Sequence, residues 1–149
     1  MTLLGFLSMK VKDLMTKDTV AVGVDASLLR VKEIFDSNSF HHLPVVKNSS
    51  VVGIISKSDL LLMMDWGLRL GIKGSEIRNE MLLKSNLAAD IMTHNVMTVL
   101  PNDTLQYCLG IYLENYFRAL PVVDDEKNLC GIITSYDILR GLELYKMVP

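Results

Sequence analysis

The sequence has few cysteines, few aromatic residues and no long apolar run. Two of its 149 residues are cysteines, and Cys108 and Cys130 stand in apolar segments without a Cys-x-x-Cys arrangement. We therefore expect two buried thiols in a reducing, cytoplasmic setting, with no disulfide and no metal site. Aromatic residues make up 7% of the chain, whereas half of all residues are hydrophobic. This composition is typical of a well-packed globular α/β protein and excludes a disordered one.

Charge and hydropathy exclude two further classes of partner. The net charge is −2 and no stretch is strongly basic, so we expect no nucleic-acid binding. No apolar run approaches the roughly 20 residues of a membrane span, because the most apolar stretch, residues 60–64, is closed by Asp65. Residues 1–8 are apolar but lack a basic segment before them and a small-residue cleavage site after them. We expect residues 1–10 to form an ordered N-terminal arm.

Motifs that carry catalysis are also missing. The chain contains no Gly-x-x-x-x-Gly-Lys-[Ser/Thr], Gly-x-Ser-x-Gly, His-Glu-x-x-His or Gly-x-Gly-x-x-Gly pattern. Its three histidines are the adjacent pair His41 and His42, and His94 in a predicted loop. Both cysteines lie in apolar runs, whereas a nucleophilic thiol needs an exposed, cationic setting. The sequence therefore predicts that the protein is not an enzyme.

What the chain does contain is an internal repeat. Shifted by 77 positions, Asp13-Leu14-Met15-Thr16 falls on Asp90-Ile91-Met92-Thr93, and Leu43-Pro44-Val45-Val46 falls on Leu120-Pro121-Val122-Val123. After one inserted residue, Gly53-Ile54-Ile55-Ser56 falls on Gly131-Ile132-Ile133-Thr134, and Asp59 on Asp137. Identical residues occupy 12 of the positions 13–46 and 5 of the positions 53–61. The insertion falls in a polar stretch that suits a hairpin turn, so the sequence is a tandem duplication.

Each repeat predicts the same order of elements, β-α-β-β-α, with an N-cap Ser27 or Thr104 before its first long helix. Continuous apolar strands indicate a sheet that is buried on both faces. The expected elements are helical turns at 11–15 and 89–92, extended segments at 20–22 and 97–99, helices ending near Asn38 and Asn115, paired strands at 43–46 with 51–55 and at 120–123 with 129–133, and helices that start at Ser56 and Thr134.

The segment between the repeats is predicted to be helical. The closing helix of the first repeat is expected to continue to about Leu70, where Gly71 and Gly74 interrupt it, and Ser75 to cap another helix through Leu83. The amphipathic segment 62–88 holds the chain's single tryptophan, Trp66, and either packs on a neighbouring helix or makes a dimer or partner contact. The predicted domains are an arm at 1–10, a first repeat at 11–70, a helical connector at 71–88 and a second repeat at 89–145.

Three motifs, repeated in order, make the chain similar to the CBS (cystathionine-β-synthase-type) domain family: Asp-x-Met-Thr, Leu-Pro-Val-Val, and Gly-Ile-Ile-[Ser/Thr]-x-x-Asp. They cover residues 11–62 and 89–142. The resemblance implies a stand-alone Bateman module, in which the sheets of two α/β repeats pack together with pseudo-twofold symmetry. It also implies two clefts for AMP, ADP, ATP or, less often, S-adenosylmethionine, and a disc-like homodimer formed through helices. Residues 60–64 and Ile138, Leu139 and Leu142 offer apolar surface for that dimer.

The Ser/Thr-x-x-Asp turns suit such a ligand. Asp59 and Asp137, in the first turn of a helix, can accept hydrogen bonds from the cis-diol of a ribose. Ser56 and Thr134 add hydroxyl groups beside backbone N–H groups that favour phosphate. The alternative is that these residues only cap their helices. Ser58 offers a further ligand contact, whereas its counterpart Tyr136 can cover the site or stack on a base.

A second group of residues precedes each Leu-Pro-Val-Val. It comprises Phe40, His41 and His42 in the first repeat, and Phe117, Arg118 and Ala119 in the second. The resemblance implies that the first group joins Thr134 and Asp137 in cleft one, and that Phe117 and Arg118 join Ser56, Ser58 and Asp59 in cleft two. Imidazole or guanidinium groups would contact phosphate, and the phenylalanines would line the adenine pocket.

Two features of this group limit the prediction. Ala119 stands where a second basic residue is common in the family, which weakens the case for several phosphates in cleft two. The histidine pair can also be a solvated pair at a strand entrance, and adjacent strand residues that face opposite ways disfavour a metal site. We expect cleft one to bind better than cleft two.

Two functions remain open from the sequence. The first is regulatory binding and sensing of an adenine nucleotide, acting on an unidentified partner protein and requiring no cofactor. The second is a structural dimerisation module whose ligand clefts are degenerate, with S-adenosylmethionine as an alternative ligand of the first. A ligand stabilises the folded state only if it binds that state better than the unfolded one. A titration with adenosine compounds that follows the melting temperature therefore separates the two functions.

Overall fold

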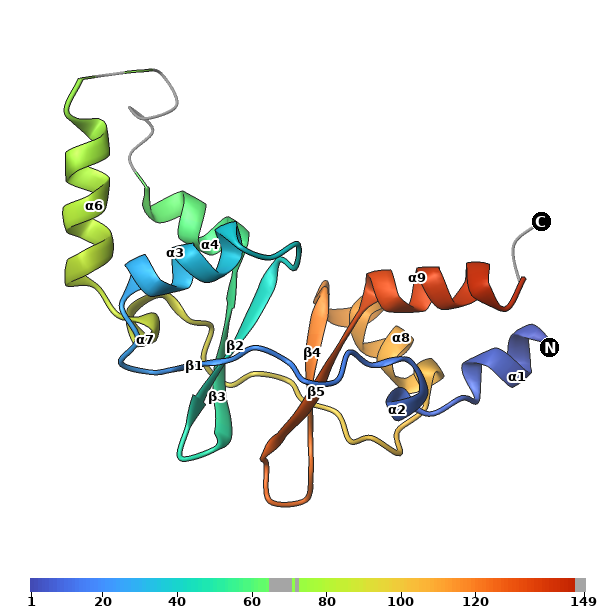
Figure 1. Cartoon of the computed structure of the whole chain (residues 1–149). Helices are drawn as coiled ribbons and strands as arrows, with labels where there is room; N and C mark the ends of the chain where they lie inside the picture. The colour runs from blue at the N-terminus through green and yellow to red at the C-terminus, as the bar shows by residue number, and fades with distance from the viewer. Residues whose placement is uncertain (65–70, 72, 147–149) are drawn as a thin grey trace. The chain divides into compact units, whose positions relative to one another are not determined.

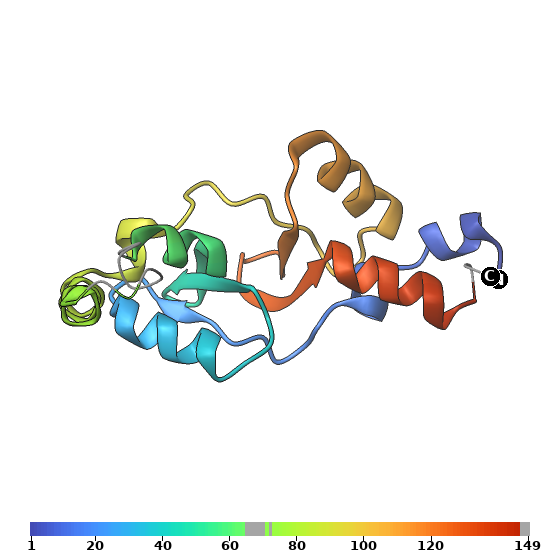
Figure 2. The same ribbon diagram turned by 90° about the horizontal axis from the view of Figure 1, so that it is seen from above.

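The computed structural model describes residues 1–64, 71 and 73–146. They form a mixed α/β structure with a three-stranded sheet in the order β1-β2-β3 and a two-stranded sheet, β4-β5 (Figures 1 and 2). The elements are α1 (Leu3–Leu7), α2 (Val11–Leu14), β1 (Val22–Gly23), α3 (Leu28–Asp36), β2 (His42–Lys47), β3 (Ser50–Ser56), α4 (Lys57–Met63), α6 (Ser75–Ser85), α7 (Ala88–Ile91), α8 (Leu105–Asn115), β4 (Ala119–Val123), β5 (Leu129–Thr134) and α9 (Ser135–Leu144).

The predicted duplication is visible in the backbone. Ser27 and Thr104 cap α3 and α8 as predicted, each accepting a hydrogen bond from the N–H three residues on, at 3.2 Å. Val22 pairs with Val45 in parallel between β1 and β2, and Val99 makes the equivalent parallel bridge to Val122. The ends of α3 and α8, the strands of both hairpins, and the starts of the closing helices α4 and α9 lie within about two residues of the predicted positions.

The one-residue insertion lies in the hairpin turn, as the repeat predicts. In the first repeat the turn is made by Asn48 and Ser49, both at positive φ (50° and 68°). In the second repeat the turn is longer, only Lys127 is at positive φ (66°), and Asp124 closes it. The Asp124 carboxylate accepts hydrogen bonds from the backbone N–H groups of Glu126 and Asn128, both at 2.9 Å.

The two compact units of the structure do not coincide with the two sequence repeats. One, which we call the α8 unit, comprises residues 1–19, 49–51 and 96–149; the other, the α3 unit, comprises residues 20–48 and 52–95. Thus α1 and α2, at the N-terminus, lie beside α8 and α9 in both views (Figures 1 and 2). The opening segment of each repeat therefore completes the unit that holds the body of the other repeat.

Matching backbone bridges attach these opening segments. Thr16 pairs with Ile132 on β5, and its counterpart Thr93 pairs with Ile54 on β3. Near the start of the same segments, Lys10 bridges to Thr104, and Leu87 bridges to Ser27. Because both bridges recur at equivalent positions, the exchange of segments is a property of the duplicated unit.

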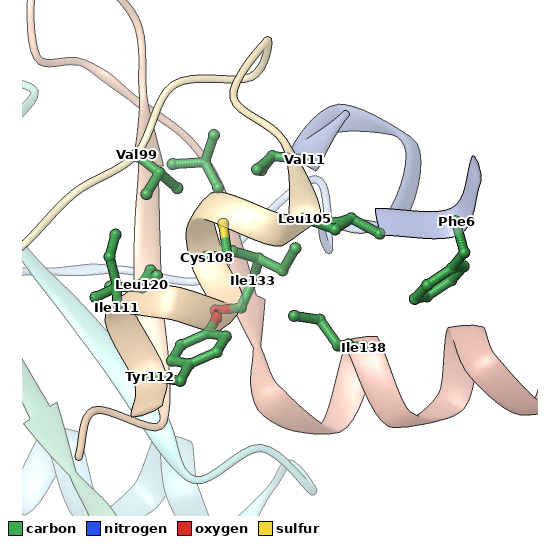
Figure 3. Packing of buried hydrophobic residues seen from close by; sticks show 11 residues of the cluster. Phe6, Val11, Val99, Leu105, Cys108, Ile111, Tyr112, Leu120, Ile133 and Ile138 are labelled. Carbon is green, nitrogen blue, oxygen red and sulfur yellow. Dashed lines mark hydrogen bonds between the residues drawn. The ribbon is translucent and has the colours of Figure 1, made fainter. Parts of the chain in front are cut away.

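Each unit has its own hydrophobic core. In the α8 unit, side chains from α1, α2 and α8, β4 and β5, and α9 converge (Figure 3), and they are Phe6, Val11, Val99, Leu105, Cys108, Ile111, Tyr112, Leu120, Val122, Ile133 and Ile138. In the α3 unit the equivalent core is Val22, Leu28, Val31, Ile34, Phe35, Leu43, Val45, Ile55, Leu60, Leu83 and Ala88. The spacing of these residues on α3 and α8 matches the helical periodicity of the sequence.

The connector differs from the prediction in its details. Gly74, at φ 88°, is the N-cap of α6, and Ser75 is its first helical residue, fully buried. The helix ends at Ser85 and not at Leu83, and it packs beside α3. The predicted extension of the preceding helix to Leu70, and Trp66, lie outside the described residues; α4 ends at Met63. A glycine takes the cap position because its conformation is left-handed there.

Two other expectations, on the extended segments before α3 and α8 and on the burial of the strands, need correction. Only Val22–Gly23 forms a strand before α3, and residues 97–99 form the single bridge at Val99. β4 is buried along its length, whereas β3 has only Gly53 and Ile55 buried, so β3 is not covered on both faces.

None of the described helices has the length and hydropathy that crossing a bilayer requires.

The predicted dimer surface is also smaller than expected. Leu60 and Ile138 belong to the cores of their own units, and Leu142 is partly buried. Leu61, Leu62 and Leu139 are the exposed leucines of the predicted surface, at 41%, 71% and 64%. Leu60 and Ile138 directly follow the carboxylates of the Ser/Thr-x-x-Asp turns, and that position in the first helical turn faces the core.

Candidate functional site

The Ser/Thr-x-x-Asp turns fold as reciprocal capping boxes at the starts of α4 and α9. Ser56 Oγ accepts from the N–H of Asp59 at 3.0 Å, and Asp59 Oδ2 accepts from the N–H of Ser56 at 3.2 Å. In the other unit, Thr134 Oγ1 accepts from the N–H of Asp137 at 3.2 Å, and Asp137 Oδ2 accepts from the N–H of Thr134 at 2.7 Å. The capping role that the sequence left open is therefore real in both repeats.

Capping uses only one oxygen of each carboxylate. Among the described residues, none donates a hydrogen bond to Oδ1 of Asp59 or of Asp137, although both side chains are half-buried. A carboxylate oxygen without a donor, on a half-buried side chain, is a site at which a ligand hydroxyl gains a charge-assisted hydrogen bond. The arrangement can therefore cap the helix and accept a ligand diol at the same time.

The chain contains two more carboxylates in similar caps, which serve as an internal comparison. Asp13 Oδ2 accepts from the N–H of Lys10 at 3.0 Å, and Asp90 Oδ2 accepts from the N–H of Leu87 at 2.6 Å. These two carboxylates are exposed, and the residues that they cap, Lys10 and Leu87, carry no hydroxyl. A cap alone requires neither the hydroxyl nor the partial burial found at α4 and α9.

The start of each hairpin lies directly beside the capping box of the same repeat. The N–H of Lys57 donates to the carbonyl of His41 at 2.8 Å, and the N–H of Ser135 donates to the carbonyl of Arg118 at 3.2 Å. The structure thus brings His41 to Ser56 and Asp59, and Arg118 to Thr134 and Asp137. The sequence could not reveal these contacts, because they are made by backbone atoms.

These backbone bonds reduce the number of N–H groups that a phosphate can use. In α4, the N–H groups of Lys57 and Asp59 are already bonded, and in α9 those of Ser135 and Asp137 are. Within the described part of each first turn, the N–H groups of Ser58 and Tyr136 are left. The first turns therefore offer few N–H groups to a ligand, and a phosphate held there would depend mainly on side-chain cations.

The side chains at the hairpin starts differ between the repeats. Phe40 is half-buried against the α3-unit core, where its ring meets that of Phe35 edge-on at 6.2 Å between centroids. Phe117 is more open, at 40% exposed, and His41, Arg118 and Ser58 are exposed as well. Ala119 is buried in β4, so no cation could take its place without loss of core packing. The composition of the two clefts stays a prediction. Cleft one would combine Thr134 and Asp137 with Phe40, His41 and His42, and cleft two would combine Phe117 and Arg118 with the Ser-x-x-Asp turn of the first repeat.

Other candidate sites on the described surface are weaker. A hollow of about 390 Å³ lies on α8 and contains none of the predicted site residues; it is lined by Thr104, Gln106, Tyr107, Gly110, Ile111 and Glu114. The described residues contain no cluster of three or more His, Cys, Asp or Glu side chains that could hold a metal. Cys108 is buried and Cys130 half-buried, and both are free thiols. Burial, with a smaller effect of Asp103, raises the pKa of Cys108 to about 11, which keeps it a thiol at neutral pH.

One residue of the site was missed by sequence reasoning. The hydroxyl of Tyr112 on α8 donates to the carbonyl of Ile133, the residue before Thr134, at 2.8 Å. The signal was present in the repeat, because Tyr112 corresponds to Phe35 and is the member of that pair with a polar group.

The fold and this pair of turns match a known family. The model of the CBS domain matches residues 11–65 and 88–144, which together form most of the sequence. The chain belongs to the CBS-domain family, and its two repeats form a CBS pair. Proteins with such pairs are generally regulatory modules.

A relative and several solved structures of CBS pairs are similar to this chain over nearly its whole length. The uncharacterized protein MJ1426 of Methanocaldococcus jannaschii is 32% identical over 155 residues, which cover 90% of this chain and 91% of that protein. CBSX2 of Arabidopsis thaliana is 25% identical, with a TM-score of 0.80 over 95% of this chain and 99% of that one, and CBSX2 has also been solved with AMP. The CBS pair of MJ0100, solved with 5′-methylthioadenosine and S-adenosylmethionine, is 26% identical, with a TM-score of 0.69 over 93% and 97% of the chains.

Other relatives are longer than the segment that matches. The chain spans 44% to 47% of three further Methanocaldococcus jannaschii proteins. It spans about a quarter of homoserine O-acetyltransferases from Methanosalsum zhilinae and Methanocorpusculum labreanum. The part these enzymes share with this chain is the CBS pair.

Proposed function

We propose that the chain is a regulatory module that binds adenine nucleotides at its two Ser/Thr-x-x-Asp turns and signals their presence to a partner protein. The observation that carries this proposal is the half-buried carboxylate that caps α4 or α9 with one oxygen and keeps the other available. The adenosine compounds bound by CBSX2 and by MJ0100 support the ligand class.

In this proposal each group of side chains has one role. Oδ1 of Asp59 and of Asp137 accepts hydrogen bonds from the ribose hydroxyls, and Ser56 and Thr134 hold the carboxylates in place. The rings of Phe40 and Phe117 flank the adenine. The side chains of His41, His42 and Arg118 contact phosphate, and Ser58 adds a polar contact in its own turn.

The predicted assignment combines residues from both repeats. Phe40, His41 and His42 would serve the ligand held by Thr134 and Asp137, and Phe117 and Arg118 the ligand held by Ser56, Ser58 and Asp59. Loss of AMP affinity at the Asp137 site in an Arg118→Ala variant, with no loss in His41→Ala, would contradict this assignment and support sites built within single repeats. We propose no catalytic step and no required cofactor for either site.

A titration of thermal stability tests the proposal. A ligand that binds only the folded state adds about 2.7 kcal/mol at 100 times its Kd, so Tm should rise with the ligand concentration. We expect a rise with AMP, ADP or ATP, and GMP at equal concentration is the control for the base. Parallel titrations with 5′-methylthioadenosine and S-adenosylmethionine determine whether a phosphate is needed. No rise with any of the five adenosine compounds at millimolar concentration would contradict the proposal.

Self-association without a ligand is the second candidate function. It is favoured by large apolar side chains on exposed helix faces, among them Leu62 (71% exposed) and Leu139 (64%). Light scattering after size-exclusion chromatography measures the mass of the free protein. A dimer that forms without ligand and weakens in Leu62→Asp or Leu139→Asp supports this function, and a dimer is also compatible with nucleotide binding. A monomer at all concentrations excludes it.

A further inference from the structure

The two capping boxes are not equally tight. The N–H of Thr134 donates to Asp137 Oδ2 at 2.7 Å, whereas the N–H of Ser56 donates to Asp59 Oδ2 at 3.2 Å. Thr134 also donates its hydroxyl to the same oxygen at 2.8 Å. Within the described residues, Ser56 Oγ makes no corresponding bond to Asp59. Asp137 is therefore held by two short bonds from one residue, and Asp59 by a single longer one.

A buried tyrosine lies behind the tighter box. Tyr112 is 7% exposed and stands in the core of the α8 unit, and its hydroxyl donates to the carbonyl of Ile133 at 2.8 Å (Figure 3). That carbonyl belongs to the same peptide group as the N–H of Thr134. In the α3 unit the equivalent residue is Phe35, which has no hydroxyl and contacts the ring of Phe40 instead.

The peptide group connects these two hydrogen bonds. A carbonyl that accepts a hydrogen bond polarises its amide, so that the N–H of the same amide becomes a better donor. The order is Tyr112 hydroxyl, Ile133 carbonyl, Thr134 N–H, Asp137 Oδ2. Burial, and after it the nearby ionisable groups of Cys108 and Asp137, raise the pKa of Tyr112, so its hydroxyl stays protonated and continues to donate.

We infer that Tyr112 is a positioning residue for the Asp137 carboxylate, and that it makes the turn at α9 a better-ordered acceptor for a ribose diol than the turn at α4. Tyr112 acts through the Ile133–Thr134 peptide and does not contact the ligand. The ligand part of this inference rests on the proposed function; the hydrogen-bond part does not. A carboxylate whose orientation is already fixed loses less entropy when it binds a ligand.

The hydrogen-bond part is tested without ligand by amide NMR of the whole protein. We expect the Thr134 amide proton to resonate further downfield and to exchange more slowly than the Ser56 amide. In Tyr112→Phe, the Thr134 resonance should move upfield and its exchange accelerate. Tyr107→Phe, on the same helix at a half-exposed side chain, is the control that should leave both unchanged. An unchanged Thr134 amide in Tyr112→Phe would overturn the inference.

The ligand part needs a readout that a general loss of stability does not produce. In an Asp59→Asn background, calorimetry should give an AMP affinity that falls about threefold to tenfold in Tyr112→Phe, the range expected for one hydrogen bond. The affinity for 2′,3′-dideoxy-AMP should not change, because that compound lacks the diol. An equal loss for both compounds would show a structural role only and overturn the positioning role. If the wild-type protein binds neither AMP nor 2′,3′-dideoxy-AMP, the proposed function fails. The amide measurement then still decides whether Tyr112 orders the turn at α9.

Discussion

Met92 packs directly over Gly53. A Cβ atom on Gly53 would clash with the Met92 sulfur, and one on the equivalent Gly131 would lie 2.6 Å from the carbonyl oxygen of Thr16 and 2.9 Å from the Met15 sulfur. The methionine of Asp-x-Met-Thr and the glycine of Gly-Ile-Ile are therefore two halves of one contact. Both motifs have a packing role that is separate from any ligand.

This contact predicts what alanine does at these glycines. Gly53→Ala and Gly131→Ala should each destabilise the protein by about 1–3 kcal/mol, as overpacking does. Gly131→Ala should cost more, because backbone moves less readily than the end of a methionine. At Gly110, inside α8, a Cβ would meet no atom within 4 Å among the described residues beyond its own helix turn, and Gly110→Ala should stabilise by about 1 kcal/mol. Urea unfolding measures all three, and equal effects at the three glycines would contradict the packing.

The exchange of opening segments predicts which fragment of the chain can fold. Residues 20–95 contain α7 together with Met92 and Thr93, which contact Gly53 and Ile54. Residues 20–87 lack them and also lack the fully buried Ala88. We expect the fragment 20–95 to unfold cooperatively and the fragment 20–87 to have a lower Tm or no transition. Circular dichroism during heating measures this, and equal curves would show that α7 adds nothing to the unit.

The turn between β4 and β5 predicts an acid-dependent contribution to stability. Hydrogen bonds from Asn128 hold the pKa of Asp124 below its ordinary value of 3.8. Slight burial of the carboxylate opposes this effect, and a backbone hydrogen bond from Glu126 adds to it. The pKa of Asp124 is lower in the folded protein than in the unfolded chain. Its contribution to the free energy of unfolding is therefore complete at pH values above the unfolded-state pKa, and it is lost as the pH falls through the folded-state pKa. At pH 7 the wild-type protein should unfold at a higher urea concentration than the Asp124→Asn variant. This difference between the two urea midpoints should vanish in strong acid. A difference that is constant with pH would contradict this assignment.

Local features of the fold could be read from the sequence, and long-range ones could not. The caps at Ser27 and Thr104 and the insertion near Asn48 follow from side chains that act on their own backbone within a few residues. The place of Val11 in the core of the other repeat's unit is different, because an apolar residue reveals that it is buried and not what covers it. Gly74 displaced Ser75 as a cap because backbone conformation decided the position.

The candidate site shows the same division. Asp59 and Asp137 were recognisable because a hydroxyl and a carboxylate recur at one spacing. The backbone bonds of His41 and Arg118 to the next helix were not, since any residue can make them. Tyr112 was overlooked because its neighbours on α8 are apolar and its hydroxyl contacts a main-chain carbonyl in another element.

The most direct test of ligand binding compares carboxylates that cap helices with and without the proposed ligand role. Isothermal titration calorimetry with AMP should show at least tenfold weaker binding at one site in Asp59→Asn and at the other in Asp137→Asn, and no measurable binding in the double variant. Asp90→Asn and Asp13→Asn remove the same charge from a cap of the same unit and should change the affinity less than twofold. Equal affinities in all four single variants would contradict the account, because Asp59 and Asp137 would then be helix caps only.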